Sequence, residues 1–280
     1  MSNLFDGLES MGLGKLSNVD VYESEDTSKK DSEKSSEKQQ ILETDFIFDK
    51  SYKCPVCDKE FKSKTVKTGK VKLISADTDL RPKYQAVDSL KYDVVACPYC
   101  GYAALNRFFS YMTSTQARLI KENISSSFKS SNVESDVLSY DEAITKHRLA
   151  LLNTIVKKGK LSEKAYTCLK TAWLLRGKRE TLAEDTKGYT KIKEDLEKQE
   201  QDFLMNAYEG FSEAFSKELF PMCGMDELTI TYLLADLARR VGKYEESMRF
   251  VSKVIVSKEA NERIKDKARQ IKQMISEEIN

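Results

Sequence analysis

The sequence predicts an α+β protein that is mostly α, in which a small cysteine-bearing β region precedes an array of helical hairpins. Two Cys-Pro-x-Cys turns, at 54–57 and 97–100, lie in a stretch rich in β-branched residues and lysine. From residue 105 onward, apolar residues recur at helical spacing. We therefore expect three parts. Residues 1–43 form a disordered tail with a possible short helix, 44–104 the cysteine domain and 105–280 the helical domain.

Composition restricts the class of protein. The 280 residues carry a net charge of +1, so no global field indicates nucleic acid or membrane as a partner. No apolar run reaches 18 residues, and residues 1–15 lack the basic start and apolar core of a secretory signal. Six cysteines in such a chain fit a reducing compartment and a bound metal better than disulfides. We expect a cytoplasmic protein without membrane contact.

The N-terminal tail is predicted from its polarity, because residues 18–43 contain too little apolar surface to bury. Ahead of this segment, Leu4, Phe5, Leu8 and Met11 follow a helical spacing. They could form a docking peptide that folds on a partner, or simply a frayed terminus.

The two cysteine turns predict a metal site. Each Cys-x-x-Cys turn directs two thiolates at one point, and two such turns supply the four ligands of a closed tetrahedral zinc site. Asp58 and Gly101 directly follow the turns and tolerate the left-handed backbone that completes them. In a common ribbon roughly 15–20 residues separate the turns, whereas 39 do so here, so the insert must fold back to the metal. We expect one structural Zn²⁺ bound by Cys54, Cys57, Cys97 and Cys100.

The sequence allows two other uses of the cysteines. Cys97-Pro-Tyr-Cys100 also has the dithiol spacing of glutaredoxin-like thiol-disulfide oxidoreductases, but that reading leaves the first turn without a role. A catalytic zinc would need an open ligand position, and the single histidine, His147, follows a helical pattern in the next domain. No phosphate loop, His-Glu-x-x-His motif or nucleophile elbow is present, so we expect no enzyme.

The insert between the turns is predicted to contain short strands. Residues 61–74 are β-branched and lysine-rich, with Gly69 as a possible turn, and indicate a hairpin or two short strands. Residues 92–96 indicate a strand leading into the second turn. The lysines could track phosphates of a nucleic acid, or protect a solvated edge strand from aggregation. The lysines are Lys59, Lys62, Lys64, Lys67, Lys70 and Lys72.

A second polar group in the insert is a candidate binding cluster. Carboxylates beside an arginine could bind a cationic group, or form an ion-pair network that orients the insert against the ribbon. The residues of this cluster are Asp77, Asp79, Arg81, Tyr84 and Asp88.

The helices of the second half are predicted from N-terminal capping motifs and from the spacing of apolar residues. Thr113 with Gln116, and Ser139 with Glu142, match capping boxes. Pro221 and Gly224 interrupt the pattern. The expected helices cover 138–156, 161–175, about 180–219, 228–241, 244–256 and 264–279.

The helix pair around Gly242 carries a repeat signature. Six residues stand where a tetratricopeptide repeat has Leu, a small residue, Gly, Tyr, a small residue and a large apolar residue. We expect two to three degenerate tetratricopeptide-like hairpins, with an ordinary helical bundle as the alternative. The six residues are Leu234, Ala235, Gly242, Tyr244, Ser247 and Val251.

The insert and the second turn resemble a bacterial family catalogued as a domain of unknown function. The resemblance rests on Asp77-Thr-Asp-Leu-Arg-Pro82 and on Cys97-Pro-Tyr-Cys-Gly-Tyr-Ala-Ala104, and it spans roughly residues 44–260. It implies a zinc ribbon followed by tetratricopeptide-like helices, and it brings no activity with it. We expect a non-enzymatic zinc-binding scaffold or adaptor that binds a protein partner. The alternatives are a nucleic-acid-binding ribbon that uses residues 59–72 and, behind it, a thiol oxidoreductase.

Overall fold

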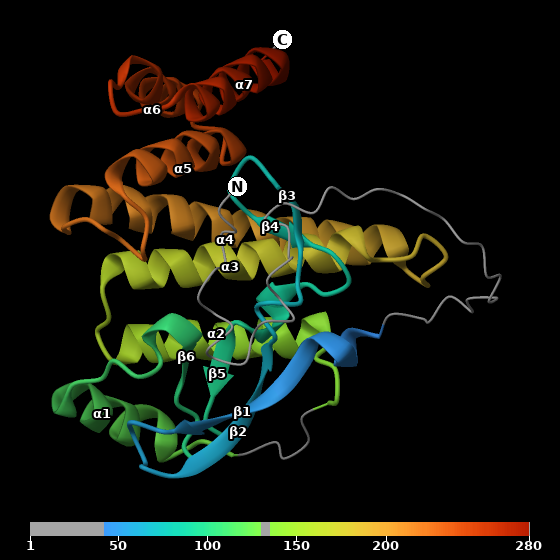
Figure 1. Ribbon diagram of the computed structural model, residues 1–280, viewed down its shortest axis with the longest axis vertical. Coiled ribbons are helices and arrows are strands. Elements are labelled where there is room, and N and C mark those ends of the chain that lie inside the picture. The colour runs from blue at the N-terminus through green and yellow to red at the C-terminus, as the bar shows by residue number, and fades with distance from the viewer. Residues whose placement is uncertain (1–41, 130–134, 280) are drawn as a thin grey trace, which may run out of the picture. The chain divides into compact units, whose positions relative to one another are not determined.

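The computed structural model describes residues 42–129 and 135–279, which belong to one compact unit. Small antiparallel hairpins come first and helices packed as hairpins follow, so the predicted mostly-α α+β class is confirmed (Figure 1). The expected tail and its apolar stripe, Leu4 to Met11, lie outside the described residues. The division into ribbon and helical domains at residue 104 stays a prediction.

The strands form three separate two-stranded antiparallel sheets. In the first sheet β1 pairs with β2 so that Lys53 lies opposite Glu60, and in the third β5 pairs with β6 so that Ala96 lies opposite Ala103. Each cysteine turn is therefore the tip of a hairpin. The strands are β1 (Ile47–Lys53), β2 (Glu60–Val66), β3 (Leu73–Ala76), β4 (Pro82–Tyr84), β5 (Val94–Ala96) and β6 (Ala103–Leu105).

Of the two alternatives for residues 61–74, the structure has two short strands and not a hairpin. Residues 61–74 contribute to two strands, but these do not pair across Gly69: β2 pairs back to β1, and β3 pairs forward to β4. The cysteine turn itself connects the first pair, with Cys54 N donating to Lys59 O at 3.0 Å. Strand β5 also starts later than expected, because Asp88 caps a 3₁₀ helix at Ser89–Tyr92.

Seven α-helices follow within the described residues, and most match the expected ranges. Both predicted capping boxes are confirmed, with Thr113 and Ser139 as the N-cap residues. The long helix expected from about 180 begins only at Tyr189, because the preceding helix continues to Glu180 and Gly188, at φ +79°, lies in the connection. The helices are α1 (Ser114–Ile120), α2 (Tyr140–Val156), α3 (Leu161–Glu180), α4 (Tyr189–Lys217), α5 (Glu227–Arg240), α6 (Tyr244–Val256) and α7 (Glu262–Ile279).

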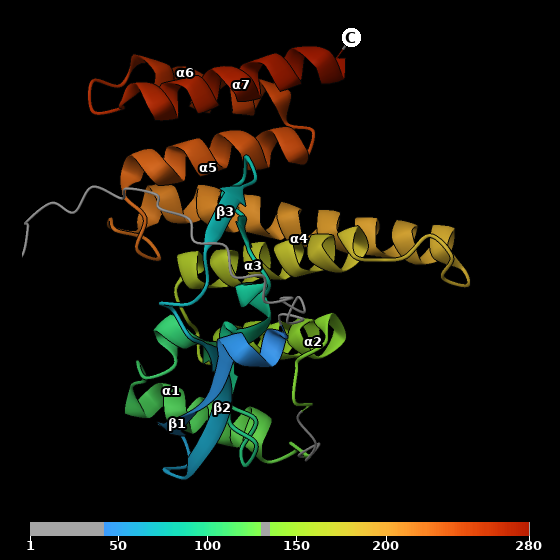
Figure 2. The same ribbon diagram turned by 45° about the vertical axis from the view of Figure 1, so that its right-hand side comes forward.

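Helices α5 and α6 form the tight pair that the repeat signature predicted. Gly242 between them has φ +75°, a conformation that side-chain-bearing residues rarely adopt. Buried Ser247 donates from Oγ to Ala235 O at 2.6 Å, which holds the two helices close. Figure 2 shows α5 next to α4, with α6 and α7 stacked beyond it.

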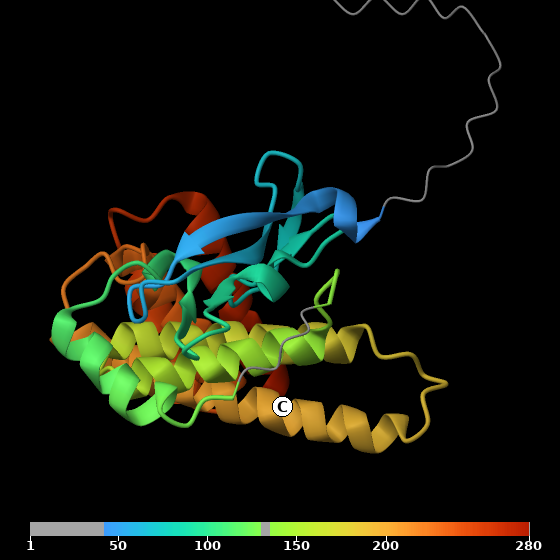
Figure 3. The ribbon, with the colours of Figure 1, turned by 90° about the horizontal axis from the view of Figure 1, so that it is seen from below.

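The β region packs along one side of the helices, and Figure 3 shows it there with the long helices running across the view. Strands β5 and β6 lie against α2. The turn between β3 and β4 reaches farther and contacts Trp173 of α3 and Tyr232 of α5. Between α3, α4 and α5 lies the main apolar core, which includes Leu169, Phe211 and Leu233. The hairpin that carries the second cysteine turn is therefore seated directly on the helical array.

Candidate metal centre and charged network

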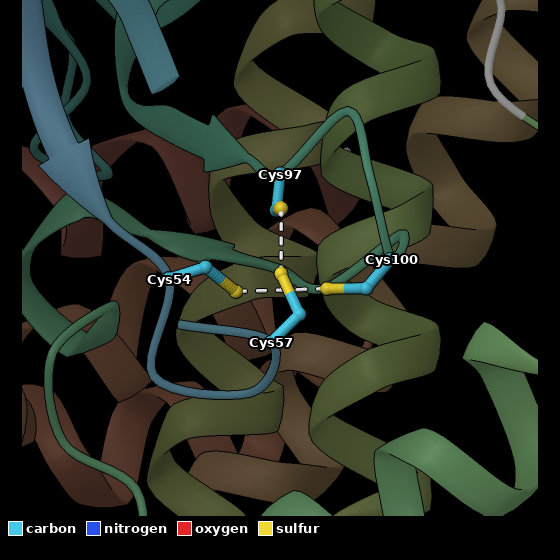
Figure 4. Close-up of side chains that lie close together, drawn as sticks. All are labelled: Cys54, Cys57, Cys97 and Cys100. Carbon is cyan, nitrogen blue, oxygen red and sulfur yellow. Dashed lines mark hydrogen bonds between the residues drawn. The ribbon is translucent and has the colours of Figure 1, made fainter. Parts of the chain in front are cut away.

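The two hairpin tips bring all four predicted cysteines together (Figure 4). The Sγ atoms of Cys54 and Cys100 are 3.5 Å apart, and those of Cys57 and Cys97 are 3.6 Å apart. All four sulfurs lie within 4.8 Å of one another. Three of the residues are buried and Cys57 is partly exposed. No other group of three or more possible metal ligands occurs in the part of the chain that the structure describes.

The backbone of both turns has the conformation that metal knuckles require. Asp58 has φ +61° and Gly101 has φ +72°, as the sequence predicted. The amides of these residues close each turn on the carbonyl of its first cysteine, at 2.9 Å for Cys54 O and 3.1 Å for Cys97 O. In the first turn, Val56 N also donates to Cys54 Sγ at 3.4 Å, which would offset thiolate charge.

The donor set and its spacing fit one metal ion. Four sulfurs at zinc–sulfur distances of about 2.3 Å in a tetrahedron would lie roughly 3.8 Å apart. The two hydrogen-bonded pairs are close to this separation. In the thiol form, hydrogen bonds from Cys100 and Cys54 lower the pKa of Cys97, while hydrogen bonds to Cys54 and Cys97 raise the pKa of Cys100. One sulfur therefore ionises first and its neighbours share the remaining protons. A divalent ion can replace those protons.

The second knuckle is fastened to the helices by hydrogen bonds. Ser125 Oγ donates to Cys100 O at 2.8 Å, and Asn153 Nδ2 of α2 donates to Gly101 O at 3.0 Å. The ring of Phe128 lies so close to Gly101 that a Cβ there would be 2.5 Å from it. This knuckle is thus positioned by the helical part of the chain.

The first knuckle is held mainly by aromatic packing. Tyr52 and Phe61, on β1 and β2, place their ring centroids 5.7 and 5.9 Å from that of Phe109. Phe109 also packs on buried Tyr102, whose hydroxyl donates to Phe109 O at 3.0 Å. The two knuckles therefore meet over one small aromatic core, and the sulfurs lie at its edge.

The polar cluster of the insert becomes a buried charged network. Asp79 is 0% exposed and accepts hydrogen bonds from Arg176 Nη2 at 2.7 Å and from Trp173 Nε1 at 3.0 Å. Burial alone would raise the pKa of Asp79, but the positive charges of Arg176 and Arg240 lower it overall. Arg176 also donates to Glu200 of α4 at 2.7 Å. The tip of the β3–β4 hairpin is thereby bound to α3 by ion pairs, and Arg176 connects it to Glu200 of α4.

Three of the five predicted cluster residues lie together, and the other two lie to the side. Asp77 is 3.1 Å from Arg176 and 3.0 Å from Lys83, and Arg81 donates to Glu180 at 2.9 Å. Asp88 instead accepts a hydrogen bond from Tyr140 of α2. Tyr84 lies in β4 opposite Leu73, without a side-chain hydrogen bond among the described residues.

A second part of the network lies on α5. Asp236 is 0% exposed and accepts from Thr78 Oγ1 at 2.8 Å and from Arg240 Nε at 2.7 Å. Arg240 Nη2 donates to Thr78 Oγ1 at 3.0 Å, and Tyr232 donates to Thr78 O at 2.7 Å. Thr78, which lies between Asp77 and Asp79, is therefore held to α5 by three hydrogen bonds.

Sequence reasoning missed the helical half of this network. Trp173, Arg176, Glu200, Asp236 and Arg240 come from helices that are distant in sequence from the insert. One signal was available: Asp236 interrupts the run Leu-Leu-Ala-Asp-Leu-Ala, a core-facing helical pattern. A charged residue at such a position indicates a buried partner.

The six predicted lysines do not form a uniform basic stripe. On β2, Lys64 lies opposite Asp49, and its Nζ is 3.5 Å from Asp49 Oδ1. Lys62 lies opposite Ser51, two residues along the strand from Glu60. Lys59 covers the ring of Tyr99 at 4.8 Å, and Lys67 donates to a backbone carbonyl. Lys70 and Lys72 are exposed in the β2–β3 connection. Nucleic-acid binding by these lysines stays a prediction, as does a redox role for Cys97.

The remaining candidates are placed in the helical interior. His147 is 0% exposed, and its Nδ1 lies 2.8 Å from Ala143 O. Burial lowers the pKa of His147 to about 4, so the imidazole is neutral near pH 7. It does not belong to the sulfur cluster. Cys168 and Cys223 are buried free thiols.

The fold and the sulfur cluster define a class: a helical-hairpin protein with a four-cysteine site able to hold one metal ion. The chain belongs to the DUF2225 family, described as an uncharacterized protein conserved in bacteria, whose family model matches residues 47–275. No curated protein and no solved structure matches the chain. Within the described residues, none of the helices has the length and apolar character needed to cross a bilayer.

Proposed function

We propose that this chain is a non-enzymatic scaffold protein with one structural Zn²⁺, and that it acts by binding a protein partner. The observation that carries the proposal is the sulfur cluster. Two hairpin tips bring four sulfurs to one point, three of them on buried residues, and four thiolates leave zinc no open position for a substrate. Thiolate ligands need reducing surroundings, so the proposal places the protein in the cytoplasm.

The cysteines would fasten the first hairpin to the rest of the fold. The second knuckle is already attached to α2 through Asn153, whereas the β1–β2 hairpin has its own pairing and an aromatic contact with Phe109. Bound zinc contributes apparent folding free energy of about 10–16 kcal/mol in small zinc domains. We therefore assign the cysteines a purely structural task, which is to close the insert and hold β1–β2 in place.

The face formed by α3, α5 and α7 is unfavourable as the partner-binding surface. Alternate helices of a hairpin array line one face, and a peptide would ordinarily lie along it. Here the tip of the β3–β4 hairpin already occupies the middle of that face through Asp79 and Thr78. Asp79 and its partner Arg176 are both buried, so a peptide could not displace the tip easily.

An aromatic surface on α4, α6 and the α4–α5 connection is better suited. The ring centroids of Phe220 and Phe250 lie 5.6 and 6.4 Å from that of Phe215, and Leu219 beside them is 91% exposed. Aromatic residues are enriched in protein interfaces. Lys253 lies over two of these rings and has no carboxylate partner in the described part of the chain. We propose that this surface receives an apolar partner segment that carries a carboxylate for Lys253.

Metal analysis tests the first half of the proposal. Protein purified under reducing conditions should contain one zinc per chain, and all four ligand cysteines should resist alkylation until a chelator is added. An absence of tightly bound metal in folded protein, or rapid alkylation of Cys97 in metal-loaded protein, would contradict a closed structural site. The second result would favour the thiol-redox alternative.

Crosslinking in the native host tests the second half. Full-length tagged protein should crosslink to a partner that Leu219→Asp removes, because this change places a charge in the aromatic surface without altering the core. Leu152→Asp on α2, where Leu152 is 50% exposed, is the matched control and should retain the partner. Equal recovery with both variants would refute the assignment of this surface.

A further inference from the structure

A small cavity lies where the β3–β4 tip meets the last helices. Its volume is about 280 Å³. Thr78 and its neighbours in the tip form one wall, α5 forms the second, and Lys267 and Gln270 of α7 form the third. One water occupies about 30 Å³ of liquid volume, so the cavity has room for a small organic molecule. No residue of the zinc site or of the aromatic surface lines it.

Arg240 is held in a fixed orientation beside this cavity. Its Nε donates to fully buried Asp236 and its Nη2 to Thr78, which leaves Nη1 without a partner among the described residues. The side chain is 20% exposed, so this nitrogen remains accessible. A guanidinium positioned by a buried carboxylate is a preorganised anion-binding group, because little side-chain entropy remains to be lost on binding.

A second positive charge comes from α7. Lys267 lines the cavity and has neither an ion pair nor a hydrogen bond with any residue that the structure describes. Its side chain is only partly exposed. The neighbouring Gln270 also lines the cavity and has no hydrogen-bond partner within the described residues. The cavity thus combines one fixed cation, one unpaired cation and an unpaired amide.

The one carboxylate that lines the cavity does not neutralise these cations. Asp77 is 3.1 Å from Arg176 and 3.0 Å from Lys83, and Arg81 lies 3.7 Å away. Its charge is therefore offset by three cations outside the cavity. The Tyr232 hydroxyl donates a hydrogen bond to Thr78 O, and burial raises the pKa of Tyr232 above its ordinary range, so the side chain remains neutral.

We propose that this cavity binds the phosphate group of a small phosphorylated molecule, with Arg240 and Lys267 as the charged ligands. A phosphate monoester carries a charge of about −1.5 to −2 near pH 7, which matches two cations better than a single carboxylate does. Phosphate oxygens also accept hydrogen bonds from guanidinium and ammonium groups at once. The site joins the β3–β4 tip to α7, so bound ligand stabilises the contact between them.

Calorimetry on the full-length, zinc-loaded protein tests this site. The probes are inorganic phosphate and glycerol 3-phosphate, titrated at constant ionic strength, with succinate as a dicarboxylate of similar charge. We expect saturable binding of both phosphates and weaker binding of succinate. Lys267→Ala should weaken phosphate binding at least fivefold, and Lys267→Arg should retain it within about twofold. The matched control is Lys272→Ala, which removes an exposed lysine of α7 that does not line the cavity.

Several outcomes would overturn the proposal. These are absence of saturable phosphate binding to the wild type, equal affinities of the Lys267→Ala and Lys272→Ala variants, and tighter binding of succinate than of both phosphates. A thermal melt of each variant accompanies the titrations. Phosphate should raise the melting temperature of the wild type and of Lys272→Ala, and should raise that of Lys267→Ala by less at the same concentration.

Discussion

Replacing Asp79 by asparagine should destabilise the protein strongly, although the two side chains have nearly the same size. Asp79 is fully buried and accepts from Arg176 and Trp173. Asparagine removes the negative charge and leaves the buried Arg176 with one fewer carboxylate. Removing one partner of a buried ion pair typically costs about 3–5 kcal/mol. Because Glu200 still accepts from Arg176, we expect the lower half of that range.

The matched control is Asp49→Asn on β1. Asp49 also pairs with a cation, Lys64, at 3.5 Å, but its side chain is 52% exposed. An exposed pair of this kind contributes about 0–1 kcal/mol. Urea unfolding of the zinc-loaded protein, followed by circular dichroism, gives the free energy of unfolding of both variants. A loss below about 1 kcal/mol for Asp79→Asn, or equal losses for the two variants, would refute the view that the network secures the hairpin tip.

The pH dependence gives a second test of the same residue. Burial would raise the pKa of Asp79, but Arg176 and Arg240 hold it below its ordinary value. A carboxyl whose folded pKa is lowered adds stability above its unfolded pKa, about 3.9, and this stability is lost as the pH falls further. The wild type should thus lose more stability on acidification below about pH 4 than Asp79→Asn does. Parallel acid-unfolding curves would argue against the assigned charge state.

Three further outcomes are expected. Cys57→Ser should abolish stoichiometric zinc binding, measured by elemental analysis. It should also raise hydrogen exchange in residues 47–66 more than in 76–82, because only the β1–β2 hairpin is expected to be held in place by the metal site. Gly101→Ala should lower the free energy of unfolding in urea by at least about 2 kcal/mol, because alanine is strained at φ +72° and its Cβ would clash with Phe128. His147, the only histidine, should stay neutral above about pH 5 in NMR titration. The pKa of His147 is about 4 in the folded protein and about 6.5 in the unfolded chain. The free energy of unfolding of the wild type should therefore fall by up to about 3 kcal/mol as the pH drops from about 6.5 to about 4. The fall should be smaller in His147→Gln, which has no imidazole to protonate.

Local sequence signals predicted the four-cysteine cluster well. A Cys-x-x-Cys turn is defined by neighbouring residues, so the ligands and the left-handed Asp58 and Gly101 could all be read from spacing. The capping boxes at Thr113 and Ser139 were equally local, and so was the turn at Gly242. In each case the interaction that fixes the conformation joins residues no more than a few positions apart.

Competing local pairings and nonlocal contacts set the limit of prediction. Strand β2 pairs with β1 across the first cysteine turn, and composition at Gly69 does not show that this pairing prevails over one with β3. The partners of Asp79 lie about a hundred residues away, on α3 and beyond. The sequence could identify the carboxylates of the insert as unusual, but only the packed structure shows that α3, α4 and α5 supply the cations and the further carboxylates.

The cavity beside the hairpin tip and the aromatic surface are separate sites. Asp79 and Thr78 hold the tip against α3 and α5, and the same contact creates the cavity beside Lys267. The aromatic surface around Phe215 belongs to α4, α6 and the α4–α5 connection, and shares no residue with that cavity. Because distant sites without shared contacts act additively, Leu219→Asp should leave phosphate affinity unchanged, and Lys267→Ala should leave partner crosslinking unchanged. If either variant altered both properties, the two surfaces would be energetically coupled, and bound phosphate would then regulate the partner.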